Sequence, residues 1–174
     1  MPKITKPQFE KYLRSLAPIQ LLDEMLLLYS KLKTVQEYYE GVLNSDNSET
    51  LENYKSKLQK EYMPAKGYGK ARSGEARKIV LDFKKISSNQ EDIVALILFR
   101  TEMMLDFTNA YGDIDEPFYN TLESCFLDAC KIIKKNNLQE KFEDKCQILL
   151  DKAGDLGWGV PDSMYSIFEE YFEK

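Results

Sequence analysis

Hydrophobic residues recur at intervals of three and four along almost the whole chain, which is the spacing of an amphipathic helix. The clearest series runs through one segment and comprises Leu22, Leu26, Tyr29, Leu32, Val35, Tyr39 and Val42. No run of strict alternation rich in Val, Ile and Thr suggests a strand. We therefore predict an all-α fold with about eight helices and no sheet.

Proline, glycine and short polar residues set the expected helix boundaries. Seven of the predicted helices are residues 7–16, 18–43, 49–63, 73–86, 88–110, 137–154 and 161–172. Another helix, capped at 113 or 115, follows the 88–110 helix and includes residue 133. Ser88 with Glu91 has the pattern of a capping box, Gly112 of a helix stop, and Pro117 of a first-turn residue. The 18–43 helix, about 39 Å long at ~1.5 Å per residue, is expected to be the spine of the fold.

The connections between these segments are short, which favours antiparallel neighbours. We therefore expect helix hairpins stacked as a bundle or a short α-superhelix, and a single domain over residues 1–174. The break at 64–72 is the one candidate for an internal linker. Trp158 lies between glycines and is expected to pack the last helix onto the core, because large aromatic side chains dominate core burial.

Histidine is absent from the 174 residues, which excludes Ser-His-Asp and Cys-His nucleophile systems and His-ligated zinc. The three cysteines are an odd number, and Cys125 and Cys130 point about 140° apart on one helix. Buried free thiols in a reducing cytoplasm are therefore expected. The N-terminus lacks the apolar region of a signal peptide, and the longest apolar run is only 93–99, so we expect no membrane segment.

Charge is distributed unevenly along this acidic chain, whose net charge is −5. Residues 55–85 contain ten Lys or Arg and three acidic residues, whereas the stretch between Arg100 and Lys131 contains seven acidic residues and no Lys or Arg. Such a polarised surface attracts anions to one face. The carboxylates could also neutralise the basic face, within one molecule or between two copies.

The segment 66–72 combines cations, glycines and a tyrosine just before a helix, which are the ingredients of an anion site. It is not a phosphate-binding loop of the Walker A type, because Pro64 and Ala71 occupy positions that require Gly and Ser or Thr. A flexible solvated loop is the alternative interpretation. The candidate residues for an anion or an acidic partner are Lys66, Tyr68, Lys70, Arg72, Arg77, Lys78 and Lys84.

Two further groups of residues are candidates for metal binding, catalysis or ligand binding. Glu102, Asp106, Asp113 and Glu123 resemble oxygen ligands for a divalent ion or the carboxylates of a hydrolase, but their spacing matches no known loop, and helix caps and solvated faces explain most of them. Trp158 and Asp162 form a candidate ligand loop. We predict no catalytic residue, cofactor or metal from these patterns.

Four motifs together resemble a family of small uncharacterised bacterial proteins, a domain of unknown function. They are Lys70-Ala71-Arg72, Asp82-Phe83-Lys84-Lys85, the segment 111–120 (YGDIDEPFYN) and Gly157-Trp158-Gly159. The similarity spans nearly the whole chain. It implies an all-helical fold and supplies no activity and no functional residue.

The leading hypothesis is a cytoplasmic, non-enzymatic interaction module whose basic face binds an acidic protein partner or a second copy. The alternative is binding of a phosphate-bearing ligand or nucleic acid through residues 66–85, with nucleic acid disfavoured by the acidic remainder. A carboxylate hydrolase or a metal-binding protein is the third hypothesis.

Overall fold

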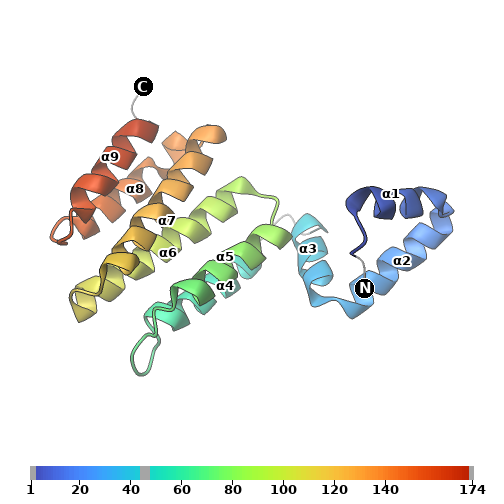
Figure 1. Cartoon of the computed structure of the whole chain (residues 1–174), viewed down its shortest axis with the longest axis horizontal. Helices are drawn as coiled ribbons and strands as arrows, with labels where there is room; N and C mark the ends of the chain where they lie inside the picture. The colour runs from blue at the N-terminus through green and yellow to red at the C-terminus, as the bar shows by residue number, and fades with distance from the viewer. Residues whose placement is uncertain (1–2, 44–47, 173–174) are drawn as a thin grey trace.

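The computed structural model of the chain describes residues 3–43 and 48–172. Within these ranges it contains nine helices and no strand, which confirms the all-α prediction (Figure 1). The helices are α1 (Lys6–Ser15), α2 (Pro18–Lys31), α3 (Lys33–Leu43), α4 (Ser48–Tyr62), α5 (Ser73–Ile86), α6 (Gln90–Tyr111), α7 (Glu116–Lys135), α8 (Gln139–Ala153) and α9 (Val160–Phe172).

Helix α6 is the centre of the bundle formed by α4 to α9. It contacts α4, α5, α7 and α8, and twelve of its residues are buried. The apolar run 93–99 explains this position, because a helix that is hydrophobic around most of its circumference needs neighbours on several sides. The connections from α5 to α9 are short, whereas residues 63–72 form a longer connection between α4 and α5. Figure 1 shows α6 beside α7 and α8 beside α9.

Helices α1 to α3 lie to one side of this bundle (Figure 1). Helix α3 makes the connection, because it contacts both α2 and α5. No residue of α1 or α2 is buried, although α2 is rich in leucine. Among the described residues, none of the helices has the length and hydropathy that a membrane crossing requires.

The single long helix predicted for residues 18–43 is wrong. The chain divides at Leu32, whose backbone is extended at φ −117° and ψ 110°. The Gln36 side chain donates a hydrogen bond of 2.8 Å to the Tyr29 carbonyl, which satisfies one of the open carbonyls at the end of α2. No glycine or proline marks this position, so the sequence pattern contains no signal for the break. Helix α6, and not α2, is the spine of the fold.

The helix boundaries follow local chemistry in most places. The Asp115 carboxylate accepts a hydrogen bond of 2.9 Å from the Phe118 N–H, and Pro117 lies in the first turn, as predicted. Gly112, at φ 85°, ends α6 as expected. The capping box predicted at Ser88 is wrong, because Asn89 is the N-cap and accepts a hydrogen bond from the backbone of Glu91 at 3.0 Å.

Trp158 does not enter the core, which corrects the prediction that it packs the last helix onto the core. Its side chain is 58% exposed and stacks on Tyr119 of α7 at a ring distance of 5.8 Å. Val160 and Met164 fill the buried positions of α9 instead. The backbone of Trp158 has a φ of 63°, in the left-handed region that residues with a side chain rarely adopt.

Candidate anion-binding site

The predicted anion loop, residues 66–72, surrounds a carboxylate of the protein itself. The backbone N–H groups of Lys70 and Ala71 both donate to the Glu61 carbonyl, at 2.9 and 3.1 Å. The Arg72 N–H and Nε donate to Glu61 Oε1 at 2.8 and 2.9 Å, and Arg72 Nη2 donates to Oε2 at 2.8 Å. The hydrogen bond from Arg72 lowers the pKa of Glu61 although burial raises it. These donors are therefore engaged internally and do not face a ligand.

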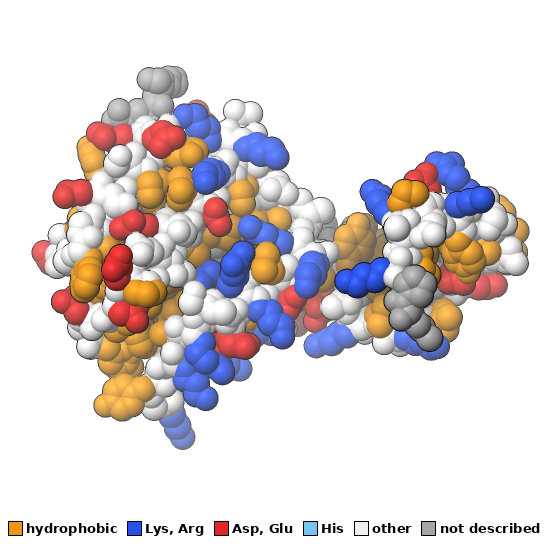
Figure 2. All heavy atoms as spheres, in the orientation of Figure 1, with side chains coloured by type: hydrophobic (Ala, Val, Ile, Leu, Met, Phe, Trp, Pro, Cys, Tyr) orange, Lys and Arg blue, Asp and Glu red, His pale blue; other side chains and the backbone are white. Residues whose placement is uncertain are grey.

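The remaining predicted residues divide into two groups. Lys66, Tyr68, Lys70 and Lys78 lie exposed on the surface, and the Tyr68 ring approaches that of Tyr111 at 5.5 Å. Arg77 and Lys84, in contrast, line a pocket between α5, α6 and α7. Figure 2 shows Lys and Arg side chains gathered over the middle and right of the bundle, and most of its Asp and Glu side chains toward the left edge of the view.

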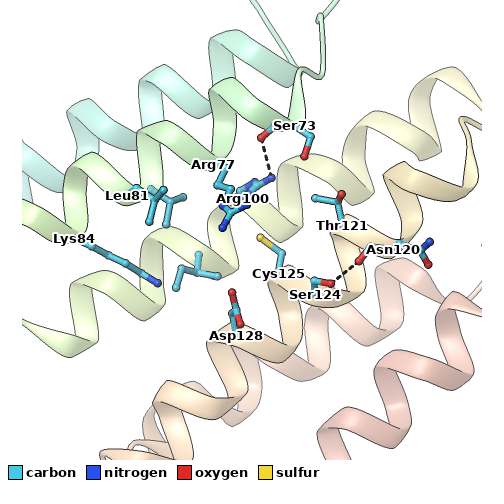
Figure 3. Close-up of a pocket in the computed structure, with 12 residues that line it drawn as sticks. Ser73, Arg77, Leu81, Lys84, Arg100, Asn120, Thr121, Ser124, Cys125 and Asp128 are labelled. Atoms are coloured by element: carbon cyan, nitrogen blue, oxygen red, sulfur yellow. Dashed lines mark hydrogen bonds between the residues drawn. The ribbon is translucent and has the colours of Figure 1, made fainter.

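This pocket has a volume of about 460 Å³. Its walls are Ser73, Arg77, Val80, Leu81 and Lys84 from α5, Ile97 and Arg100 from α6, and Asn120, Thr121, Ser124, Cys125 and Asp128 from α7. In Figure 3 the cationic side chains of α5 and α6 extend toward α7. The two cations from α5 are seven residues apart, which places them on the same face of the helix.

Arg100 is the unusual residue of the pocket. It is only 6% exposed, and its guanidinium makes one long hydrogen bond, from Nη2 to the Ser73 carbonyl at 3.4 Å. Its Nε and the neighbouring Tyr62 hydroxyl have no partner with hydrogen-bond geometry among the described residues, although the Tyr62 hydroxyl lies near enough to contribute to raising the pKa of Arg100. Burial lowers the pKa of Arg100, but Cys125, Tyr62 and Asp128 together raise it overall, so the guanidinium is charged.

A buried cation without a paired anion is energetically unfavourable, because the desolvation penalty amounts to several kcal/mol per ion. No described acid forms an ion pair with Arg100; Asp128, on the opposite wall, acts only at longer range. The position is therefore suited to an anion that enters from outside.

The α7 wall presents hydrogen-bond acceptors. Thr121 Oγ1 donates to the Pro117 carbonyl at 2.8 Å, and Ser124 Oγ donates to the Asn120 carbonyl at 2.7 Å. Each hydroxyl has one proton, so the lone pairs of both oxygens remain available, and Asp128 adds a carboxylate to the same face. The pocket thus has donors on one side and acceptors on the other.

Cys125 lies between these walls, but it is not a candidate nucleophile. Burial raises the pKa of its thiol, so the reactive thiolate does not form near neutral pH. All three cysteines are buried and free, as predicted, and a hydrogen bond between Cys146 and Cys130 raises the pKa of Cys146.

The acidic residues singled out from the sequence do not converge on this pocket. Glu102 accepts hydrogen bonds from Lys145 at 2.6 Å and Lys152 at 2.8 Å, and Lys152 also donates to Asp106 at 2.8 Å. Their partners come from α8 and not from the basic segment 55–85. Burial raises the pKa of Glu102, but the hydrogen bonds from these lysines lower it overall.

The other acidic candidates lie elsewhere. Asp113 accepts a hydrogen bond of 3.2 Å from the Tyr119 hydroxyl, and Glu123 is half-buried on α7. Within the described ranges, no group of three or more His, Cys, Asp or Glu side chains has an arrangement that would hold a metal ion.

The candidate ligand loop is divided in a similar way. Asp162 lines a hollow of about 500 Å³ between α8 and α9 together with Tyr165. Trp158 is not among the residues that line this hollow, because it stacks on Tyr119 instead. The two side chains therefore do not form one site.

Sequence reasoning missed Arg100, Ser124 and Asp128. A signal for Arg100 exists, because it directly follows the apolar run 93–99 on a helix that is buried on several sides. A charge at such a position is rarely buried without a partner. Thr121, Ser124 and Asp128 also recur at intervals of three and four, which places them on the same face of α7.

Comparison with known proteins identifies a relationship at the level of the family. The sequence model of DUF6155, described as a family of unknown function, matches residues 4–173. No curated protein and no solved structure matches the chain. This finding confirms the resemblance to a domain of unknown function and provides no activity.

Proposed function

We propose that this chain, which belongs to the DUF6155 family, binds a small phosphorylated ligand in the pocket formed by α5, α6 and α7. The observation that carries the proposal is Arg100, a buried guanidinium that lines the cavity and whose Nε has no hydrogen-bond partner among the described residues. The volume of about 460 Å³ falls in the range of small-ligand sites, roughly 300–1,000 Å³.

The charges of the pocket favour a phosphate over a single carboxylate. Arg77, Lys84 and Arg100 provide three positive charges, and Asp128 provides one negative charge. A phosphate monoester carries between one and two negative charges near neutral pH, so it balances this excess better than a monoanion. Arginine also presents a planar fork of N–H donors that matches phosphate geometry.

The hydrogen-bond acceptors on α7 indicate which chemical groups the other end of the ligand carries. Ser124, Thr121 and Asp128 favour groups that donate hydrogen bonds, such as hydroxyls. A ligand with a phosphate at one end and several hydroxyls at the other satisfies both walls. Sugar phosphates and polyol phosphates are the chemical class that has this pattern.

Isothermal titration calorimetry at low salt tests the proposal, with ribose 5-phosphate and glucose 6-phosphate as ligands and with the free sugars and inorganic phosphate as references. Arg77→Gln is the test variant, because its side chain is exposed and its loss leaves the core intact. Lys78→Gln is the matched control, since it removes the same charge next to the pocket without lining it.

We expect the sugar phosphates to bind more tightly than the free sugars, and Arg77→Gln to weaken binding by at least about tenfold, the effect of losing one charge-assisted hydrogen bond. Lys78→Gln should change binding little. Equal losses in the two variants would mean that only the general field of the basic face acts, and no measurable binding would refute the proposed site.

Binding of an acidic protein partner is the second candidate function. It is supported by Lys66, Lys70 and Lys78, which are exposed and form no ion pair with a described acid. In this case Lys78→Gln would weaken binding to polyglutamate as much as Arg77→Gln does.

The proposed location is a reducing cytoplasm, which the three free thiols support.

A further inference from the structure

The strongest unexplained feature outside the pocket is the apolar surface of α1 to α3. Fifteen large hydrophobic residues between Ile4 and Leu43 are 38% to 79% exposed. Taking roughly 150 Å² for a fully exposed large side chain, they present about 1,100 Å² of apolar surface. This total is spread over several sides of three helices, and it is about twice the 300–600 Å² of the largest apolar patch on a typical monomer.

One face of α2 forms the most regular part of this surface and is the most exposed face of that helix. Its residues are Ile19, Leu22, Leu26 and Tyr29, which are 63%, 53%, 57% and 42% exposed. Their spacing of three, four and three is the a/d pattern of a helix that packs along another helix.

The neighbours of α2 in the same chain leave this face open. The Tyr12 hydroxyl of α1 donates to Glu24 at 2.7 Å, and Glu24 points about 180° away from the centre of the exposed face. The Tyr39 hydroxyl of α3 reaches Met25 Sδ at 3.4 Å, on an adjacent side about 80° from that centre. Helix α2 therefore contacts α1 and α3 on sides other than the a/d face.

We propose that the a/d face of α2, residues Ile19, Leu22, Leu26 and Tyr29, is a dimer interface that binds the same face of a second copy in antiparallel orientation. The four positions are symmetric about residue 24, so Leu22 meets the partner's Leu26 and Ile19 meets the partner's Tyr29. An interface around a two-fold axis requires such self-complementarity.

Charge favours a second copy over a strongly charged partner. By the same measure the four side chains of the a/d face present about 320 Å², so the ~800 Å² per partner that a stable protein interface buries is reached only when exposed hydrophobic residues of α1 and α3 also take part. Residues 3–43 carry six basic and five acidic side chains, so this segment is almost neutral. It offers no complementarity to a strongly acidic or basic partner, and two copies do not repel each other.

This interface is independent of the proposed ligand pocket, which lies in the bundle between α5, α6 and α7. It also differs from the self-association expected from the sequence, which relied on pairing of the basic and acidic stretches. An apolar interface persists when salt is raised, whereas pairing of exposed charges weakens. Salt dependence therefore separates the two modes.

Sedimentation velocity over a range of protein concentrations, at low and at high salt, tests the interface. We expect a dimer at both salt concentrations. Leu26→Asp should weaken it by roughly 100-fold, because the substitution is made in both subunits at the centre of the interface. Ile148→Asp is the matched control, since Ile148 is 48% exposed on α8 and lies outside the α2 face.

A disulfide experiment tests the orientation. A mixture of Leu22→Cys and Leu26→Cys chains should form a crosslinked heterodimer on mild oxidation, because the native cysteines are buried. Circular dichroism of each variant verifies the helix content. A monomer at all concentrations, a dimer that Leu26→Asp leaves intact, an equal effect of Ile148→Asp, or preferential crosslinking of Leu22→Cys to itself would each overturn the proposal.

Discussion

Gly69→Ala should destabilise the protein severely, because there is no room for a side chain at this position. A Cβ atom on residue 69 would lie 1.8 Å from the Tyr62 carbonyl oxygen and 2.5 Å from its carbon. Ordinary contacts of a Cβ atom begin near 3.4 Å, so backbone must move by more than 1 Å. Tyr62 is fully buried and cannot move freely, so the loop must shift instead.

The hydrogen bonds of the loop give the magnitude. Moving residue 69 away from α4 breaks the bonds from the Lys70 and Ala71 N–H groups to the Glu61 carbonyl, and the bond from the Arg72 N–H to the Glu61 carboxylate. At about 1 kcal/mol for each net hydrogen bond, the free energy of unfolding should fall by about 3 kcal/mol.

Urea unfolding followed by circular dichroism measures this change. Gly74→Ala is the matched control, because a Cβ atom at residue 74 has nothing within 4 Å and the residue lies in α5. Replacing a helical glycine by alanine should stabilise the protein by about 0.5–1 kcal/mol. If Gly69→Ala unfolded at the same urea concentration as wild type, the close approach of the loop to α4 would not exist.

Two further predictions concern the buried charges. The folded-state pKa of Glu61 is lowered from 4.5, so its contribution to stability is complete above pH 4.5 and is lost as the pH falls through the folded-state pKa. Acid unfolding of Glu61→Gln should therefore depend less steeply on pH below 4.5 than that of wild type. An identical pH dependence would contradict the pairing of Glu61 with Arg72. Replacing Arg100 with Met should raise the free energy of unfolding by about 1–3 kcal/mol and abolish ligand binding. Thermal unfolding measures the change in stability. A loss of stability would show that Arg100 has a structural role.

The parts of the fold that were predicted correctly are those with local chemistry. Asp115, Pro117 and Gly112 each mark a helix end by a property of the residue itself, and each lies where expected. The break at Leu32 has no such marker, because it depends on Gln36 reaching back to a carbonyl of the preceding helix and on α3 packing against α2 and α5. Tertiary contacts outweigh helix propensity at that point.

The candidate site was predictable to a similar extent. Arg77 and Lys84 were identified because helical spacing places them on the same face, and both line the pocket. Their partners on the other walls, Arg100 and Ser124, are separated from them by more than fifteen residues and meet them only through the packing of α5, α6 and α7. Helix periodicity identifies one wall of such a site, but it does not show which other walls will face it.

Glu61 and Arg100 show how an internal contact differs from an open site. Both are buried charged residues, Glu61 within the basic segment 55–85 and Arg100 beyond its end, and both were absent from the predicted site. Glu61 receives three hydrogen bonds from Arg72 within the chain, so its charge is compensated in the folded protein. Arg100 makes one long hydrogen bond, its Nε has no partner among the described residues, and its side chain lines a cavity that continues to the surface. Because an uncompensated buried charge opposes folding, its retention in the core is better explained by an external anion than by stability.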